Sequence, residues 1–190
     1  MTDEARNILV VAHGRRPDTV GAAARVIGAL RDAGATPVLS SDDRAELDSA
    51  IPGPLATLGA DVAVADIELA IVLGGDGTIL RAAELVREGS APVLGINMGH
   101  VGFLAEIERD DMDEAVRRVI DRDYTVEERL ALQVRIKDRD EQVIYETWAL
   151  NEATVEKASR ERMLEVVIEI DGRPLSSFGC DGIVVSTPTG

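Results

Sequence analysis

The first half of the chain alternates short aliphatic runs with segments whose apolar residues recur at helical spacing. The aliphatic runs contain few polar residues, as expected of strands that are buried on both faces. The predicted strands are residues 7–12, 36–40, 67–73 and 91–97. The predicted helices are residues 17–34, 78–89 and 111–122, while 42–60 is ambiguous between a short helix and a loop. This alternation predicts βαβ units and a parallel sheet.

The second half of the chain changes to a period of two. Leu132, Val134 and Ile136 alternate with polar residues, and residues 164–170 repeat the pattern. Arg-Asp and Asp-Gly pairs beside such runs are typical of hairpin turns. We therefore expect three parts, listed here by residue number: an α/β domain over 1–108, a connecting helix over 109–126 and an all-β domain over 127–190.

Charge and composition narrow the range of partners. The formal net charge is −15, which opposes binding to nucleic acid or to an anionic membrane, because both are polyanions. The first apolar run is far too short for a membrane span or a signal-peptide core, and Cys180 is the only cysteine, so no intrachain disulfide can form. We expect a cytoplasmic protein that would need a local basic cluster or a metal ion to bind an anion.

The stretch LGGDGTILRAAE places three glycines around one carboxylate, between a predicted strand and a predicted helix. The first N–H groups of a helix are unpaired, and the helix dipole favours an anion beside them. Gly74, Gly75 and Gly77 remove the Cβ atoms that would block a phosphate. Arg81, on the first helical turn, could add a bidentate contact. The turn is therefore a candidate phosphate site.

Asp76 is unusual inside such a turn, because a carboxylate beside a phosphate is electrostatically costly unless it has a role. It could hold a cation or orient a hydroxyl nucleophile for phosphoryl transfer. The structural alternative is a tight turn in which Asp76 caps the helix, and Thr78 is also suited to capping. The turn lacks the lysine of a P-loop and the second half of a G-x-G-x-x-G fingerprint.

Two further loops follow predicted strands, at the edge where α/β sheets bind ligands. In HGRRPD, Arg15 and Arg16 either meet phosphates or lie on a surface loop, and His13 is expected to pack or cap rather than catalyse. Asn97 and Gly99 follow a later strand. The sequence contains no spacing of His, Cys and Glu typical of a dedicated metal cage, so Mg²⁺ would arrive mostly with phosphates.

Four motifs occur in a fixed order along the chain: GGDGT, NMGHVGFLAE, NE and FGCDGIVVSTPTG. Together they resemble the NAD kinase family, especially its bacterial members, from about Val72 to the last residue. The resemblance implies a Rossmann-like α/β domain, a β-sandwich domain and an active site between them. It also implies phosphoryl transfer from ATP, or in some members from inorganic polyphosphate, to the adenosine 2′-hydroxyl of NAD. A divalent metal, usually Mg²⁺, and a homo-oligomer (dimer or tetramer) are implied as well.

The family's functional residues can be carried over by motif. Asp76 matches the catalytic aspartate, Gly77 an adjoining dinucleotide contact and Arg81 a basic contact on the following helix. Asn151 and Glu152 match the paired ligands of NAD. The other nucleotide-binding positions are Gly75, Arg162, Asp181 and Thr189. The resemblance assigns no metal ligand.

Two alternatives stay open on the sequence. Lipid and sugar kinases carry similar GGDG turns, although the NE and DG…TPTG elements count against them. A non-catalytic nucleotide-binding or assembly module belongs to a different class. The family motif continues past STPTG into more of the β-sandwich, so we expect the β domain to be incomplete in this chain, which favours the module.

We predict that residues 1–190 alone make NADP slowly or not at all, whereas a chain extended beyond Gly190 is active. The reason is that part of the dinucleotide site and several strand partners would be missing. A coupled assay with an NADP-specific dehydrogenase measures both rates. Equal rates for the two chains would contradict the prediction.

Overall fold

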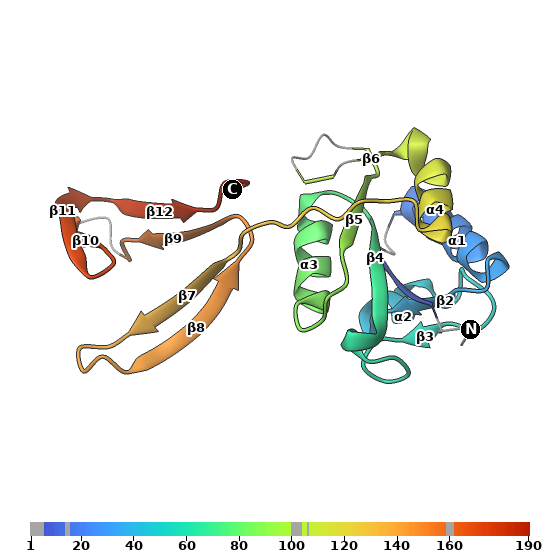
Figure 1. The fold of residues 1–190 in the computed structure, drawn as a ribbon, viewed down its shortest axis with the longest axis horizontal. Helices are drawn as coiled ribbons and strands as arrows, with labels where there is room; N and C mark the ends of the chain where they lie inside the picture. Colours follow the sequence, from blue (N-terminus) through green and yellow to red (C-terminus); the bar gives the residue numbers. More distant parts are fainter. Residues whose placement is uncertain (1–5, 14–15, 100–103, 106, 159–161) are drawn as a thin grey trace. The chain divides into compact units, whose positions relative to one another are not determined.

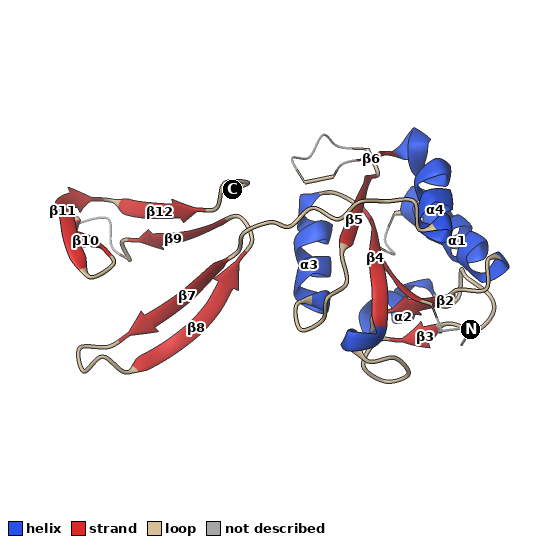
Figure 2. Cartoon of the chain, viewed as in Figure 1, coloured by secondary structure: helices blue, strands red, loops and turns tan. Residues whose placement is uncertain are grey.

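The computed structural model describes residues 6–13, 16–99, 104–105, 107–158 and 162–190. The chain divides into two compact units, residues 1–126 and 127–190 (Figure 1). The first unit contains helices and parallel strands, and the second contains strands alone among its described residues (Figure 2). The predicted fold class, an α/β part followed by a β-rich part, is confirmed.

A six-stranded parallel sheet lies at the centre of the first unit. Its strand order is β3-β2-β1-β4-β5-β6, so the order reverses beside β1. The strands are β1 (Asn7–Ala12), β2 (Thr36–Leu39), β3 (Ala56–Thr57), β4 (Ile67–Leu73), β5 (Val93–Asn97) and β6 (Ile107–Glu108). The four longer strands agree with the prediction. The two-residue strands β3 and β6 were not predicted, because two residues carry no periodic pattern.

Helices cover both faces of this sheet (Figure 1). They are α1 (Pro17–Asp32), α2 (Ser41–Leu47), α3 (Asp76–Val86) and α4 (Met112–Asp121), with short 3₁₀ turns η1 (Val64–Asp66) and η2 (Arg109–Asp111). The predicted helix 78–89 is shifted, since α3 begins two residues earlier and ends three earlier. Among the described residues, no helix has the length and apolar character needed to cross a bilayer.

Alternating side chains along the strands build two separate cores. Ile8, Val10 and Ala12 of β1 pack with α1 and α4 on one face, while Leu9 and Val11 pack with α3 on the other. All five side chains are fully buried. Burial on both faces explains why the strands read as continuous aliphatic runs rather than as alternating patterns.

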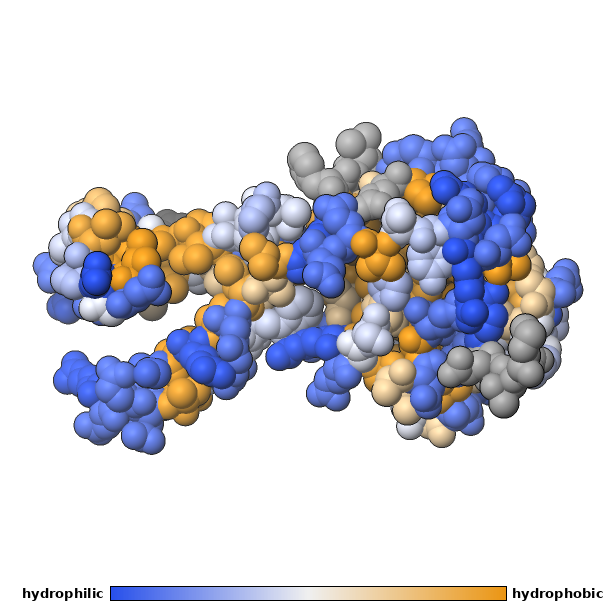
Figure 3. Space-filling view, viewed as in Figure 1, coloured by the Kyte–Doolittle hydropathy of each residue, from blue (hydrophilic) through white to orange (hydrophobic). Residues whose placement is uncertain are grey.

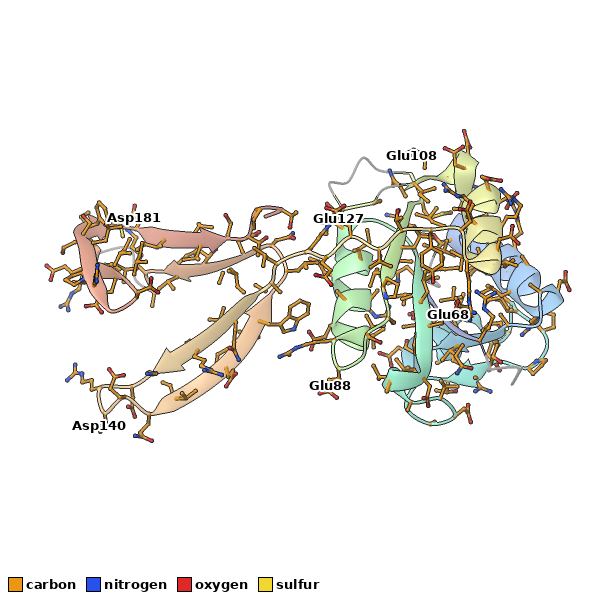
Figure 4. All side chains as sticks on the ribbon, viewed as in Figure 1. Glu68, Glu88, Glu108, Glu127, Asp140 and Asp181 are labelled. Carbon is orange, nitrogen blue, oxygen red and sulfur yellow. The ribbon has the colours of Figure 1, made fainter. Side chains whose placement is uncertain are left out.

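A charged cluster fixes the C-terminal end of α4 to the sheet. Glu68 of β4, labelled in Figure 4, accepts hydrogen bonds from Arg6 at 2.6 and 2.9 Å and from Arg122 at 2.9 and 3.2 Å. Arg6 also donates to the carbonyl oxygens of Val119 and Ile120, at 2.9 and 2.6 Å. The hydrogen bonds from Arg6, followed by those from Arg122, lower the pKa of Glu68 to about 2 against the opposing effect of burial.

The second unit consists of three antiparallel strand pairs. β7 (Leu132–Lys137) pairs with β8 (Val143–Ala149), β9 (Glu152–Glu156) with β12 (Gly182–Ser186), and β10 (Leu164–Ile170) with β11 (Arg173–Cys180). The predicted hairpin turns are present. Asp171 and Gly172 between β10 and β11 have φ values of 50° and 73°, and positive φ at both positions is what the favoured two-residue hairpin turn requires.

The strands of the second unit carry much exposed apolar surface (Figure 3). Of the large apolar side chains exposed in the described part of the chain, all but Leu80 and Val126 belong to this unit. Among the described residues the strands pair only two by two. The β-sandwich that the resemblance implies therefore stays a prediction.

We predict that Glu68→Gln lowers the free energy of unfolding by about 2 kcal/mol at pH 7, because charge-assisted hydrogen bonds from two arginines are weakened. The folded-state pKa of about 2 lies below the ordinary value of 4.5. The contribution of Glu68 is therefore complete above about pH 5 and is lost as the pH falls through the folded-state pKa. Urea unfolding at several pH values should show the difference between wild type and variant shrinking toward pH 2.

Glu114→Gln is the matched control. Glu114 also bonds an arginine, Arg117, but both side chains are more than half exposed, and such pairs contribute little. Its unfolding curve should overlay that of the wild type. An equal loss in the two variants, or a Glu68 effect independent of pH, would contradict the assignment.

Candidate functional site

A cavity of about 510 Å³ opens at the carboxyl edge of the parallel sheet in the first unit. β1 and β4 are neighbours and end at the same level, because Ala12 pairs with Leu73. The segments that follow β1, β4 and β5 meet at this edge and line the cavity. Open α/β sheets bind ligands at this position, where the strand order reverses.

The glycine-rich turn forms one wall of the cavity. A Cβ atom built on Gly75 or Gly77 would meet nothing within 4 Å, whereas one on Gly74 would lie 2.4 Å from Oγ1 of Thr78. Gly74 is therefore required by packing, and the other two glycines leave the wall bare. Gly75 is the N-cap of α3, and as a glycine it supplies no side-chain cap. Asp76, for which capping was the structural alternative, and Thr78, which is suited to capping, are instead the first and third residues of α3.

Asp76 is the first residue of α3 and lines the cavity. Its Oδ1 accepts a hydrogen bond from the backbone N–H of Leu104 at 3.1 Å. Leu104 belongs to the segment between β5 and β6, so this bond ties the carboxylate to a second loop at the same edge. A carboxylate fixed in this way can receive a proton from a ligand hydroxyl without a change of side-chain rotamer.

Arg81 lies on the first turns of α3, and its guanidinium forms hydrogen bonds to two residues at the start of α2. Its Nη2 donates to Oδ1 of Asp43 at 2.8 Å and to Oγ of Ser40 at 3.0 Å. The Asp43 side chain is only 2% exposed. Burial raises the pKa of Asp43, and its contact with Arg81 opposes the shift. Sequence reasoning missed both partners, although Ser40 and Asp43 have the spacing of a helix N-cap and its third residue.

Two residues near the end of β1 reach the same cavity. Arg16, the N-cap of α1, is exposed and lines it, and His13 lies 3.9 Å from a carboxylate oxygen of Glu46. Arg16 and Arg81 together form the local basic cluster that an anion would need in an acidic chain. Arg15, for which both a phosphate contact and a surface loop were left open, lies outside the described residues.

Asn97 shapes the loop that follows β5. It is 4% exposed; its Oδ1 accepts from the backbone N–H of Gly99 at 3.2 Å, and its Nδ2 donates to the carboxylate of Glu108 at 3.3 Å. Gly99 has φ of 128°, a conformation that favours glycine. Glu108 is labelled in Figure 4. These hydrogen bonds account for Asn97 by a structural role in this loop, without a role in ligand binding.

Three candidate residues of the second unit lie together. Glu152 pairs with Ser186 across β9 and β12, and the backbone oxygen of Asn151 accepts from the N–H of Thr187 at 2.8 Å. The hydroxyls of Thr187 and Thr189 are 3.3 Å apart. Oδ1 of Asn151 is buried and accepts no hydrogen bond from the part of the chain that the structure describes. Buried acceptors are almost always satisfied, so this atom is available to a ligand donor.

Asp181 and Arg162 are at the other end of these strands. The β9–β12 ladder runs from Glu152–Ser186 to Glu156–Gly182, a length of about 13 Å. Asp181, labelled in Figure 4, lies beyond that far end and pairs with Lys157 at 2.5 Å. Leu164 pairs with Cys180, which puts Arg162 at the same end. The structure thus separates the candidate dinucleotide ligands of this unit into two groups.

No group of three metal-ligating side chains that could hold a metal ion occurs within the described ranges. The cavity residues therefore suit Mg²⁺ only if most of its ligands come from a bound substrate and water rather than from the protein. This ion is commonly bound through one or two carboxylates and the phosphates of a substrate, and Asp76 is the carboxylate on the cavity wall.

Two family models match the chain. The ATP-NAD kinase N-terminal domain matches residues 55–124, and the ATP-NAD kinase C-terminal domain matches residues 150–190. Together they cover more than half of the 190 residues. The first includes the glycine-rich turn and Arg81, and the second includes Asn151, Glu152 and Thr189.

Curated relatives agree with the family models. An NAD kinase from Leifsonia xyli is 62% identical over 187 residues, 97% of this chain and 61% of its own length. An NAD kinase from Thermobifida fusca is 51% identical, covering 97% of this chain and 59% of the relative. NAD kinase 2 of Streptomyces coelicolor is 48% identical, covering 99% of this chain and 62% of the relative. The chain spans about three fifths of the length of these relatives.

Solved structures share the fold. Yeast NADH kinase complexed with NADH matches with a TM-score of 0.84 and 23% identity, over 100% of this chain and 59% of that chain. An NAD kinase from Archaeoglobus fulgidus in complex with ATP matches with a TM-score of 0.62 and 24% identity, over 95% of this chain and 60% of that chain.

Gly75 on the cavity wall and its neighbour Gly74 give a matched pair of variants. Gly75→Ala adds a methyl group to open space, so we predict an unchanged free energy of unfolding and binding of inorganic tripolyphosphate weakened about tenfold, the effect of losing one charge-assisted backbone contact. Gly74→Ala places a methyl group against Thr78 and should lower stability by about 1–3 kcal/mol. Calorimetric titration and urea unfolding measure the two quantities. Unchanged tripolyphosphate affinity in Gly75→Ala would contradict a phosphate site at this wall.

Proposed function

The chain belongs to the NAD kinase family, and on this basis we propose that it transfers a phosphoryl group from ATP, or from inorganic polyphosphate, to the adenosine 2′-hydroxyl of NAD, giving NADP. The observation that carries the proposal is the cavity in which a bare glycine wall, Asp76 and two arginines meet. The other kinases with a GGDG turn have no comparable support, because the matched family models cover both halves of the chain.

The donor's phosphates bind at the glycine wall in this proposal. Gly75 and Gly77 present no side chain at the start of α3, and Arg16 and Arg81 line the same cavity and supply positive charge. Phosphoryl transfer has a loose transition state, so positioning and charge neutralisation dominate over nucleophile strength. The archaeal relative in complex with ATP supports this choice of donor.

Asp76 orients the acceptor. Its carboxylate accepts the hydrogen bond of the 2′-hydroxyl, which aims the oxygen at the terminal phosphorus. As the new O–P bond forms and the bond to the leaving phosphate breaks, the hydroxyl proton passes to Asp76. The bond from Leu104 to Oδ1 holds the carboxylate in place for this step.

The second unit supplies the proposed contacts to NAD. Glu152 is an acceptor and suits ribose hydroxyls, and the unsatisfied Oδ1 of Asn151 suits a donor on the nucleotide. Thr189 lies beside them. Arg162, Asp181 and, in the first unit, Gly77 complete the set of proposed nucleotide contacts. Yeast NADH kinase complexed with NADH supports a dinucleotide ligand for this fold.

Mg²⁺ is the divalent ion that we propose accompanies the donor, held mainly by the donor's phosphates. When bound, it would neutralise phosphate charge. We also propose a cytoplasmic homo-oligomer, a dimer or tetramer, because the exposed apolar side chains of the second unit form a surface suited to association (Figure 3).

One assay tests the proposal and separates its alternatives. The chain, and a version extended beyond Gly190, are incubated with ATP, Mg²⁺ and NAD, and NADP is detected with an NADP-specific dehydrogenase. Formation of NADP supports the kinase. Binding of NAD without product would indicate a nucleotide-binding module. Neither product nor binding would indicate a kinase for another acceptor or an unfolded fragment.

We predict that Asp76→Asn lowers kcat at least about a hundredfold, because the acceptor for the hydroxyl proton is lost. The substitution is made in whichever of the two chains, residues 1–190 or the version extended beyond Gly190, forms NADP. The affinity for NAD should be unchanged, since asparagine keeps the shape and the acceptor for Leu104. Glu84→Gln, which removes an exposed carboxylate from the same helix, is the control and should keep wild-type turnover. Near wild-type kcat in Asp76→Asn would remove Asp76 from the mechanism.

A further inference from the structure

We propose that Asp43 is a positioning residue for the phosphoryl donor. It holds the guanidinium of Arg81 against the cavity wall, so that the remaining donors of Arg81 are presented to phosphate. This inference rests on the proposed function, because it assigns the role to a residue of the proposed donor site.

Only one nitrogen of the Arg81 guanidinium is engaged by the described part of the protein. Nη2 makes both contacts, to Asp43 and to Ser40, and within the described ranges Nε and Nη1 have no partner. A guanidinium carries its N–H groups in a rigid planar fork. Fixing one corner of the fork therefore fixes the direction of the others. The Arg81 side chain is 34% exposed and lines the cavity, so the fixed fork is accessible to a ligand.

Asp43 is itself immobilised, which is what a positioning group needs. Ser40 Oγ donates to Oδ2 of Asp43 at 2.9 Å and accepts from the backbone N–H of Asp43 at 3.1 Å. Both residues lie at the start of α2, directly after β2. They therefore belong to the carboxyl edge of the sheet, where the cavity opens. An arginine held in this way loses less side-chain entropy when it binds phosphate than a free one.

The sign of the charge effect distinguishes positioning from simple electrostatics. A carboxylate next to a polyanion site repels the polyanion, so removing its charge should tighten phosphate binding. If Asp43 instead acts by orienting Arg81, removing its charge should weaken binding. The two explanations predict opposite changes for the same substitution.

The test measures the affinity of inorganic tripolyphosphate by calorimetric titration of the chain. Asp43→Asn keeps the size of the side chain and should weaken binding about tenfold, the effect of losing one charge-assisted contact. Asp42→Asn removes the same charge one residue away, from an exposed position, and should leave the affinity equal or slightly tighter. Unchanged or tighter binding in Asp43→Asn would overturn the proposal.

A double-mutant cycle checks that Asp43 acts through Arg81. Arg81→Met should weaken tripolyphosphate binding, and adding Asp43→Asn to it should cause no further loss. Additive losses would overturn the proposal. In the coupled NADP assay of the active form, Asp43→Asn should raise KM for ATP about tenfold while kcat and KM for NAD stay within about twofold. A change confined to kcat would also overturn it.

Two controls keep the outcomes separate. If Asp43→Asn does not fold, Ser40→Ala, which removes a hydroxyl bonded to both partners, should weaken tripolyphosphate binding about threefold, and unchanged binding would overturn the proposal. Wild-type protein that binds no tripolyphosphate would overturn the proposed donor site itself, and the role of Asp43 with it. Wild-type binding with unchanged Asp43→Asn binding would overturn the positioning role alone.

Discussion

The reversal of strand order beside β1 is the constraint on which the first unit depends. Connections leave β1 and β4 toward opposite faces of the sheet, so among the described residues of the first unit a cavity lies at the carboxyl ends of these two strands. The glycine-rich turn after β4 and the loop after β1 border that space. Hydrophobic burial on both faces fixes the strands, and the fixed strands in turn position groups from distant parts of the sequence around one cavity.

Much of this arrangement could be predicted from the sequence, because the core is made of aliphatic runs with clear ends. Residues 7–12 and 67–73 were assigned as strands with their correct bounds. The short strands β3 and β6 could not be found, since their pairing depends on a sheet that is already formed. The start of α3 was misplaced because the helix is capped by a glycine, which leaves no polar side chain as a signal.

The candidate site was predictable where a motif carries the chemistry and not where a tertiary contact does. The glycines and Asp76 stand out in a single stretch of sequence. Asp43 does not, because its importance comes from burial beside a residue thirty-eight positions later in the sequence. In the second unit, the motifs identified candidate ligands, but only the β9–β12 register shows that they divide between two ends of a strand pair.

The cluster of Arg6, Glu68 and Arg122 also has a mechanical consequence. Tension applied to the chain at residue 127 enters the first unit just after α4, beside Arg122. Hydrogen bonds from Arg122 to β4, and from Arg6 to both β4 and the last carbonyls of α4, cross that point. Separating the end of α4 from the sheet under such tension would require these charge-assisted hydrogen bonds to break.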